Sequence, residues 1–245
     1  MRLDLFLTEK GFFKSRSKAQ AAIAAGNVTV NGVIAAKASL EINGDEDIRV
    51  INTERFVSRA GEKLFHAINE FGIDVSGMTA LDIGASTGGF TDCLLQSGAK
   101  KVYSLDVGTA QLDDNLRNDG RVTVMENFNA RYAKREDFDN AIDIIVMDVS
   151  FISQTLIYPA CEDILQTGKI MITLIKPQFE AGKKHIGKGG IVHDKDGKII
   201  KEILEKIDSS ASVFGFTRKG ITDSPIVGGD GNKEYLAIFI RGQPK

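Results

Sequence analysis

Short apolar runs recur along residues 80–240, and segments with helical spacing lie between several of them. We expect strands at 80–83, 102–106, 122–125, 142–148, 170–175, 213–218 and 235–240, and helices at 90–97, 154–165 and 198–209. Alternation of this kind predicts an α/β fold in which a mostly parallel sheet is covered by helices on both faces. Ligands of such sheets bind at the carboxyl ends of the strands, so functional residues are expected at that edge.

Residues 1–51 form a separate compositional block. Through residue 40, six basic residues stand against Asp4 and Glu9. Two stretches with helical spacing precede an alternating segment around Asn31-Gly32, a hairpin signal, and Ser15 or Ser17 could cap the second helix. This pattern predicts a small α+β domain with a local basic face that binds RNA. The candidate contacts are Arg2, Lys14, Arg16, Lys18 and Lys37.

The polar stretch after residue 51 suggests a domain boundary. We expect a linker at 52–58 and a second domain at 59–245, which begins with a helix from Gly61 to about Gly72. A length of 245 residues with 42% hydrophobic content is enough for one large core and a small satellite domain.

Composition limits the partners and the compartment. The net charge of −2 gives no global attraction to nucleic acid or to anionic membranes, so any binding to either must come from local patches. We predict no targeting signal and no membrane span. Cys93 and Cys161 are far apart and belong to no paired metal motif, so we expect neither a disulfide framework nor a metal site. A cytoplasmic protein fits best.

Two charged residues follow apolar runs directly. Asp148 closes residues 142–147, and Lys176 follows residues 170–175. If Lys63 and Glu234 converge with them at the rim of the sheet, the four make a charged cluster suited to activating a hydroxyl. A partly desolvated amine becomes a possible base, and a neighbouring carboxylate opposes that shift. The alternative is that these are strand-end charges that simply face solvent.

Residues 81–90 read as a strand, a glycine turn and the start of a helix. Asp82 precedes the first glycine, and Asp106 ends the next strand, where an acid accepts hydrogen bonds from a ribose diol. Together they suggest S-adenosylmethionine; the alternative is a plain tight turn for another ligand. Asn129 could contact an adenine edge or cap a turn. The candidate cofactor residues are Asp82, Gly84, Ala85, Ser86, Thr87, Gly88, Gly89, Phe90, Asp106 and Asn129.

Several sequence blocks resemble the TlyA family over essentially the whole chain. The N-terminal blocks, such as Ser15-Arg16-Ser-Lys-Ala, are similar to S4-type RNA-binding domains. The later blocks are Ser58-Arg-Ala-Gly-Glu-Lys63, residues 81–90, Asp148-Val-Ser-Phe151, Lys176-Pro-Gln-Phe179 and Gly231-Asn-Lys-Glu234-Tyr. The resemblance implies an FtsJ-type ribose 2′-O-methyltransferase that acts on ribosomal RNA or ribosomal subunits, with cytidine as the target nucleoside. It also implies that Lys63, Asp148, Lys176 and Glu234 are its catalytic tetrad.

The chemistry supports this reading and leaves two rivals. Lys176 is the candidate to take or polarise the hydroxyl proton, with Asp148 orienting it. Base N-methylation is disfavoured because the strand end reads Asp148-Val-Ser-Phe151 instead of Asn/Asp-Pro-Pro-aromatic. The rivals are a non-catalytic ribosome-assembly factor and a membrane-lytic, hemolysin-like protein. The segment 179–192, rich in glycine and lysine, is expected to lack regular structure and either grips phosphates or forms a solvated loop.

Overall fold

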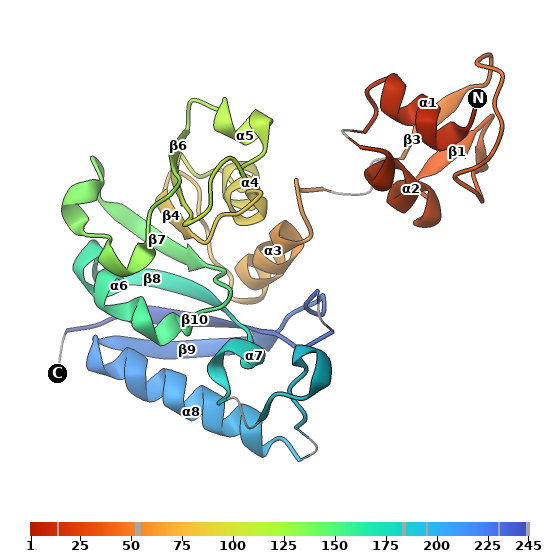
Figure 1. Ribbon diagram of the computed structural model, residues 1–245. Helices are drawn as coiled ribbons and strands as arrows, with labels where there is room; N and C mark the ends of the chain where they lie inside the picture. Colours follow the sequence, from red (N-terminus) through yellow and green to blue (C-terminus); the bar gives the residue numbers. More distant parts are fainter. Residues whose placement is uncertain (14, 52–54, 183–184, 195, 230, 244–245) are drawn as a thin grey trace. The chain divides into compact units, whose positions relative to one another are not determined.

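The computed structural model describes residues 1–13, 15–51, 55–182, 185–194, 196–229 and 231–243 (Figure 1). By its internal contacts the chain divides into two compact units, Met1–Arg55 and Phe56–Lys245. Lys14, one of the predicted RNA contacts, and residues 52–54 of the predicted linker lie outside the described residues.

The first unit packs two helices on a small sheet. Helices α1 (Leu3–Glu9) and α2 (Arg16–Ala24) accompany strands β1 (Val28–Val30), β2 (Val33–Ile34) and β3 (Ile48–Val50) in the order β2-β1-β3. The predicted hairpin is confirmed: Val30 pairs with Val33, and the two loop residues Asn31 and Gly32 have φ of 52° and 79°, as a type I′ turn requires. Ser15 is the cap of α2, since its side chain accepts a hydrogen bond from the backbone N–H of Lys18.

The second unit contains a seven-stranded sheet in the order β6-β5-β4-β7-β8-β10-β9. Its strands are β4 (Thr79–Ile83), β5 (Lys101–Leu105), β6 (Val122–Met125), β7 (Ile142–Met147), β8 (Leu165–Ile175), β9 (Phe216–Asp223) and β10 (Tyr235–Arg241). The first five strands in this order are parallel, and β10 is antiparallel to both β8 and β9. The predicted mostly parallel sheet is therefore confirmed.

Helices cover both faces of this sheet (Figure 1). They are α3 (Ala60–Glu70), α4 (Gly89–Gln96), α5 (Asp114–Arg117), α6 (Tyr158–Ile164), α7 (Pro177–Glu180) and α8 (Lys198–Val213), with 3-10 turns at Ala130–Tyr132, Arg135–Asp137, Gln154–Leu156 and Lys188–Gly190. Side chains of β7 alternate between two apolar clusters: Ile145 and Met147 pack with α6 and α8, whereas Ile144 and Val146 pack with α3 and α4.

Three predicted elements differ from the structure. The helix expected over 154–165 is split into a 3-10 turn and α6, and Leu165 already begins β8. Val213, expected to start a strand, is the last residue of α8 and is 70% exposed; the strand begins at Phe216. The segment 179–192 is more ordered than expected, because α7 reaches Glu180 and an antiparallel bridge joins Ile186 to Val192.

The end of the predicted linker packs as part of the second unit. Phe56 is buried among the apolar residues of α3 and α4. The backbone N–H of Val57 donates to Asp92 Oδ2 at 2.8 Å. Residues 56–58 are thereby held against the start of α4, directly beside the glycine turn.

Candidate active site

The glycine turn after β4 passes under the end of β7. Gly84 has φ of 82°, and a Cβ at this position would stand 2.4 Å from the carbonyl oxygen of Asp148. The N–H groups of Gly84 and Ala85 donate to the carbonyl oxygen of Leu105, and the N–H of Ser86 donates to Asp106 Oδ2 at 2.8 Å. Only glycine permits both the left-handed φ and this close approach at residue 84. The turn therefore brings the ends of β4, β5 and β7 together at one edge.

A cavity of about 460 Å³ opens at this edge. Asp106 and Asn129 bring polar groups to its wall, and Phe128 and Val149 bring apolar surface. Asp106 accepts hydrogen bonds from the N–H groups of Ser86 and Gly108 at 2.8 and 2.7 Å, which fixes its carboxylate beside the cavity. A volume of this size, mostly apolar and with a few convergent polar groups, is typical of a small-molecule or cofactor site.

A smaller cavity of about 190 Å³ adjoins the first one. The two share wall residues Gly84, Ser86, Asp148 and Ser150, while Lys176 lines only the smaller. Lys176 Nζ lies 2.5 Å from Asp148 Oδ1 and donates a hydrogen bond to Ser150 Oγ at 2.9 Å. A ligand in the larger cavity that reaches past Gly84 therefore meets an amine whose position is fixed by a carboxylate and a hydroxyl.

The other two members of the predicted tetrad form a second ion pair. Lys63 Nζ lies 2.5 Å from Glu234 Oε2, and both side chains are largely buried. Tyr235 pairs with Ile175 in the sheet, so Glu234 and Lys176 are the next residues along two neighbouring strands. The structure thus places all four residues at the same edge of the sheet, as two ion pairs.

Asp82 differs from the other predicted cofactor residues. Its side chain is fully buried and lines neither cavity; Oδ2 accepts a hydrogen bond from Thr91 Oγ1 at 2.7 Å. Burial raises the pKa of Asp82 to about 7, the hydrogen bond from Thr91 opposes that shift, and the charge of Asp148 adds to it. The expectation that Asp82 touches the ligand therefore has no support in this geometry, and the residue lies beneath the turn.

The remaining cofactor candidates divide between the two cavities. Gly84, Ser86, Asp106 and Asn129 line the larger cavity, whereas Ala85, Thr87, Gly89 and Phe90 line the smaller one together with Gly84 and Ser86. Gly88 lines neither; with φ of 96° it caps α4. The Oδ1 atom of Asn129 accepts a hydrogen bond from the N–H of Arg131 at 3.1 Å, so this residue caps a turn. It also lines the larger cavity, and its contact with an adenine edge stays a prediction.

Several lining residues were not predicted as site residues. Two of them lie inside the blocks that resemble the TlyA family, and this was an available signal. Ser150, two residues after Asp148, accepts a hydrogen bond from Lys176, and Ser58, five residues before Lys63, lines the smaller cavity. Phe128 had no such signal. Phe151 is 93% exposed with φ of 63°, lines the larger cavity, and its ring lies 5.1 Å from that of Phe179.

The first unit carries the described RNA candidates. Arg2 and Arg16 both contact Asp4, and Lys18 is exposed in the first turn of α2. Lys37 is exposed too, and the backbone of residues 38–40 accepts from Leu3 and Asp4, which brings this segment against the start of α1. The structure therefore brings Arg2 and Arg16 together.

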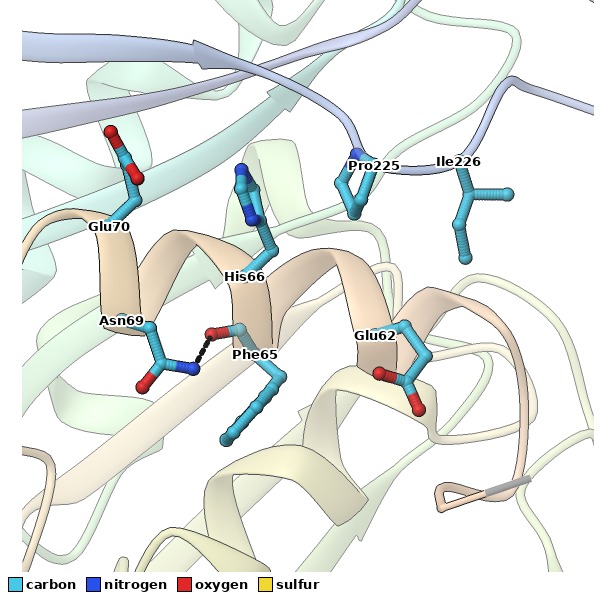
Figure 2. Close-up of a pocket in the computed structure, with 7 residues that line it drawn as sticks. All are labelled: Glu62, Phe65, His66, Asn69, Glu70, Pro225 and Ile226. Atoms are coloured by element: carbon cyan, nitrogen blue, oxygen red, sulfur yellow. Dashed lines mark hydrogen bonds between the residues drawn. The ribbon is translucent and has the colours of Figure 1, made fainter. Parts of the chain in front are cut away.

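A further hollow, of about 540 Å³, lies between α3 and the segment after β9, and none of Lys63, Asp148, Lys176 and Glu234 lines it (Figure 2). Its wall combines Glu62 and Glu70 with His66 and Pro225. His66 Nε2 lies 3.3 Å from Thr222 Oγ1. This hollow is therefore separate from the two cavities at the carboxyl ends of the strands.

Within the described part of the chain, no helix is both long enough and apolar enough to cross a membrane. The same residues include no group of three His, Cys, Asp or Glu side chains placed to hold a metal ion.

The class of protein is a methyltransferase, as the match to a family model shows for the domain that carries the sheet and its cavities. Residues 56–241 match the FtsJ-like methyltransferase family, and residues 1–48 match the S4 domain. The chain belongs to the FtsJ-like methyltransferase family and carries an N-terminal S4 domain.

Full-length relatives are found as well. Hemolysin A of Brachyspira hyodysenteriae is 50% identical over 98% of this chain and 100% of its own length. The 16S/23S rRNA (cytidine-2′-O)-methyltransferase TlyA of Mycobacterium tuberculosis is 39% identical over 99% of this chain and 90% of its own. These matches confirm the resemblance to the TlyA family.

Solved structures agree with this assignment. A proposed hemolysin from Streptococcus thermophilus matches with a TM-score of 0.78 and 42% identity, covering 100% of this chain and 89% of that one. A proposed S-adenosylmethionine-dependent methyltransferase from Listeria monocytogenes matches with a TM-score of 0.51 and 16% identity, over 76% of this chain and 100% of that one. The second match concerns the fold alone.

Proposed function

We propose that this protein transfers a methyl group from S-adenosylmethionine to the 2′-hydroxyl of a cytidine ribose in ribosomal RNA. The observation that carries the proposal is the position of Lys176, fixed by Asp148 and Ser150 in the small cavity that adjoins the larger one. The name of the M. tuberculosis relative supports cytidine and rRNA, and the S4 domain supports an RNA partner.

The larger cavity fits S-adenosylmethionine. Asp106 can accept hydrogen bonds from the ribose diol, Asn129 can contact the adenine edge, and Phe128 and Val149 offer apolar surface to the adenine ring. Gly84 lines both cavities, and a Cβ at this position would collide with the carbonyl oxygen of Asp148. When bound, this cofactor supplies a methyl group on a sulfonium sulfur.

The residues at the edge then act on the sugar hydroxyl. Lys176 binds the 2′-hydroxyl in the small cavity and takes or polarises its proton as the oxygen attacks the methyl carbon, whose bond to the sulfonium sulfur breaks and leaves a neutral thioether. Asp148 and Ser150 hold the amine in place. Holding the two reactants in near-attack geometry can itself contribute roughly 7 to 11 kcal/mol. The Lys63–Glu234 pair fixes α3 and β10 beside this site.

An unpaired nucleotide is the best-suited substrate. Its 2′-hydroxyl is accessible without helix opening, and the exposed ring of Phe151 at the rim offers a stacking surface for its base. The S4 domain provides a second RNA contact, and linked weak sites gain affinity only where both can bind at once. We therefore propose ribosomal subunits or large rRNA fragments as substrates, and the cytoplasm as the place of action.

The proposal is tested by methyl incorporation from labelled S-adenosylmethionine into intact ribosomal subunits, naked rRNA and a short oligonucleotide. Digestion to nucleosides then locates the label. We expect 2′-O-methylcytidine, with the short oligonucleotide the poorest substrate. Label on a base, or equal modification of the short oligonucleotide, would overturn the proposal.

The name of the Brachyspira relative points to membrane lysis as the rival function. A dye-leakage assay on liposomes separates the two activities. We expect no leakage at protein concentrations that give complete methylation, and the Lys176→Met variant should lose methylation without any change in leakage. Leakage by both proteins, in the absence of methyl transfer, would favour the rival.

A further inference from the structure

A fully buried carboxylate lies inside the basic S4 domain. Asp4 has no solvent exposure. Arg2 Nε donates to Asp4 Oδ1 and Arg2 Nη2 donates to Asp4 Oδ2, both at 3.0 Å. This is a bidentate fork, the strongest geometry for an arginine–carboxylate pair.

A second arginine, from another helix, donates to the same carboxylate. Arg16 Nε lies 2.9 Å from Asp4 Oδ2, and Gln20 Nε2 lies 2.7 Å from the same atom. Hydrogen bonding by Arg2, then by Gln20 and Arg16, holds the pKa of Asp4 well below its usual range, although burial opposes this. The cluster therefore consists of two guanidinium groups assembled around one permanent negative charge.

The two arginines are only partly covered. Their side chains are 38% and 48% exposed. A guanidinium has five N–H donors in a planar fork, so a carboxylate that holds one edge leaves others for a ligand. Both arginines donate to Asp4 Oδ2, so their positive charges lie close together. The cluster of two guanidinium groups and one carboxylate has a net charge of +1. Two oriented forks at this separation suit the oxygens of a phosphodiester.

We infer that Asp4 assembles Arg2 and Arg16 into a phosphate-binding site of the S4 domain, whose ligand is the RNA backbone. The inference rests on the proposed function for the nature of the ligand. Asp4 itself touches no RNA and acts as a positioning residue. This gives an unusual expectation: removing this acid from a nucleic-acid-binding surface weakens RNA binding, although it makes the surface more positive.

The test is whether removal of the Asp4 charge weakens or strengthens RNA binding. Binding of the full-length protein to a structured fragment of ribosomal RNA is measured by fluorescence anisotropy at several KCl concentrations. Asp4→Asn should raise Kd at least about tenfold, the equivalent of one lost hydrogen bond to a charged group, and should flatten the salt dependence. Glu9→Gln, an exposed acid on the same helix, is the matched control; it removes the same charge and should leave Kd equal or lower. Tighter binding by Asp4→Asn would overturn the inference.

A mutant cycle separates positioning from general loss of structure. In a protein that already carries Arg2→Ala and Arg16→Ala, Asp4→Asn should cause no further loss of RNA affinity, because the groups through which it acts are gone. If Asp4 merely supported the fold, the substitution would weaken binding by the same factor in both backgrounds.

A second pair of substitutions covers the case in which Asp4→Asn does not fold. Arg2→Lys with Arg16→Lys keeps both charges but loses the planar forks. We expect Kd to rise at least about tenfold; binding equal to wild type would overturn the inference. If the wild-type protein binds RNA but methylates no ribose, the proposed function is refuted. The effects of the Asp4, Arg2 and Arg16 substitutions on RNA binding can still be measured in that case.

Discussion

Lys63 Nζ lies 2.5 Å from Glu234 Oε2, although 171 positions separate the two residues in the chain. Their side chains are 11% and 3% exposed, so neither charge has much contact with water. The pair joins the first turns of α3 to the start of β10, next to the strand that ends at Lys176. For a buried pair, attraction is offset by the cost of desolvation, and loss of one partner leaves a charge uncompensated.

Glu234→Gln should therefore destabilise the protein. Removal of one partner from a buried ion pair costs about 3 to 5 kcal/mol, measured as the change in unfolding free energy in urea. The double variant Lys63→Met with Glu234→Gln should recover part of this loss, because no charge is then left unpaired.

The neighbouring pair Lys233–Asp223 is the matched control. It lies at 2.8 Å with both side chains about 60% exposed, so Asp223→Asn should change stability little. An equally small effect for Glu234→Gln would show that the Lys63–Glu234 pair is not desolvated in solution.

Lys176→Met should abolish methyl transfer while the affinity for S-adenosylmethionine stays similar. The side chain keeps most of its apolar stem but loses the amine that faces Asp148 and Ser150. Single-turnover methylation and calorimetric cofactor binding measure the two quantities separately. The control is Lys169→Met, inside β8 and seven residues before Lys176, where Lys169 Nζ pairs with Asp143 at 2.8 Å; its turnover should remain normal. Near-normal single turnover by Lys176→Met would make this lysine structural.

Asp106→Ala should weaken S-adenosylmethionine binding by about 1 to 3 kcal/mol, since ribose hydroxyls lose their acceptor. The substitution also releases the N–H groups of Ser86 and Gly108, which hold the turn. Titration calorimetry gives the affinity. Asp139→Ala, at an exposed acid outside both cavities, should bind the cofactor as wild type does. An unchanged affinity in Asp106→Ala would remove this residue from the cofactor site.

Asp82 should make stability fall as pH rises from about 4 to about 7. Its folded pKa of about 7 lies above its ordinary value of 3.8, so in this window the unfolded chain loses a proton that the folded protein keeps. The loss of stability is complete above the folded pKa and amounts to as much as about 4 kcal/mol. Asp82→Asn removes this dependence. Urea unfolding at pH 4.5 and pH 8 should show wild type losing stability relative to the variant.

Asp119 provides a control of opposite sign. Hydrogen bonds from Arg121 lower the pKa of Asp119 below its ordinary value of 3.8, so its contribution to stability is complete above about pH 4 and is lost as pH falls further. Asp119→Asn should therefore cost more stability at pH 4.5 than at pH 3, by a small amount because the group is near solvent. The same sign for both variants would contradict the burial effect assigned to Asp82.

The sequence by itself determined the local elements and the approximate places of chemistry. The hairpin at Asn31-Gly32 follows from preferences that act within a few residues, and so does a serine cap on α2, although the structure chose Ser15 over Ser17. Asp148 and Lys176 could be placed at strand ends because apolar runs mark buried strands. Boundaries were less certain: β8 begins already at Leu165, which pairs with Ile142 of β7, and a register shift follows before the pairing continues at Ile170.

Only the tertiary structure decided which of these residues meet. It paired Lys63 with Glu234, placed Asp4 under Arg2 and Arg16, and buried Asp82 beneath the turn instead of at the cavity wall. The physical reason is that hydrogen-bonding preference and hydrophobic period are properties of neighbouring residues. Desolvation and ion pairing depend on segments far apart in the chain, which become neighbours only when the sheet and its helices are complete.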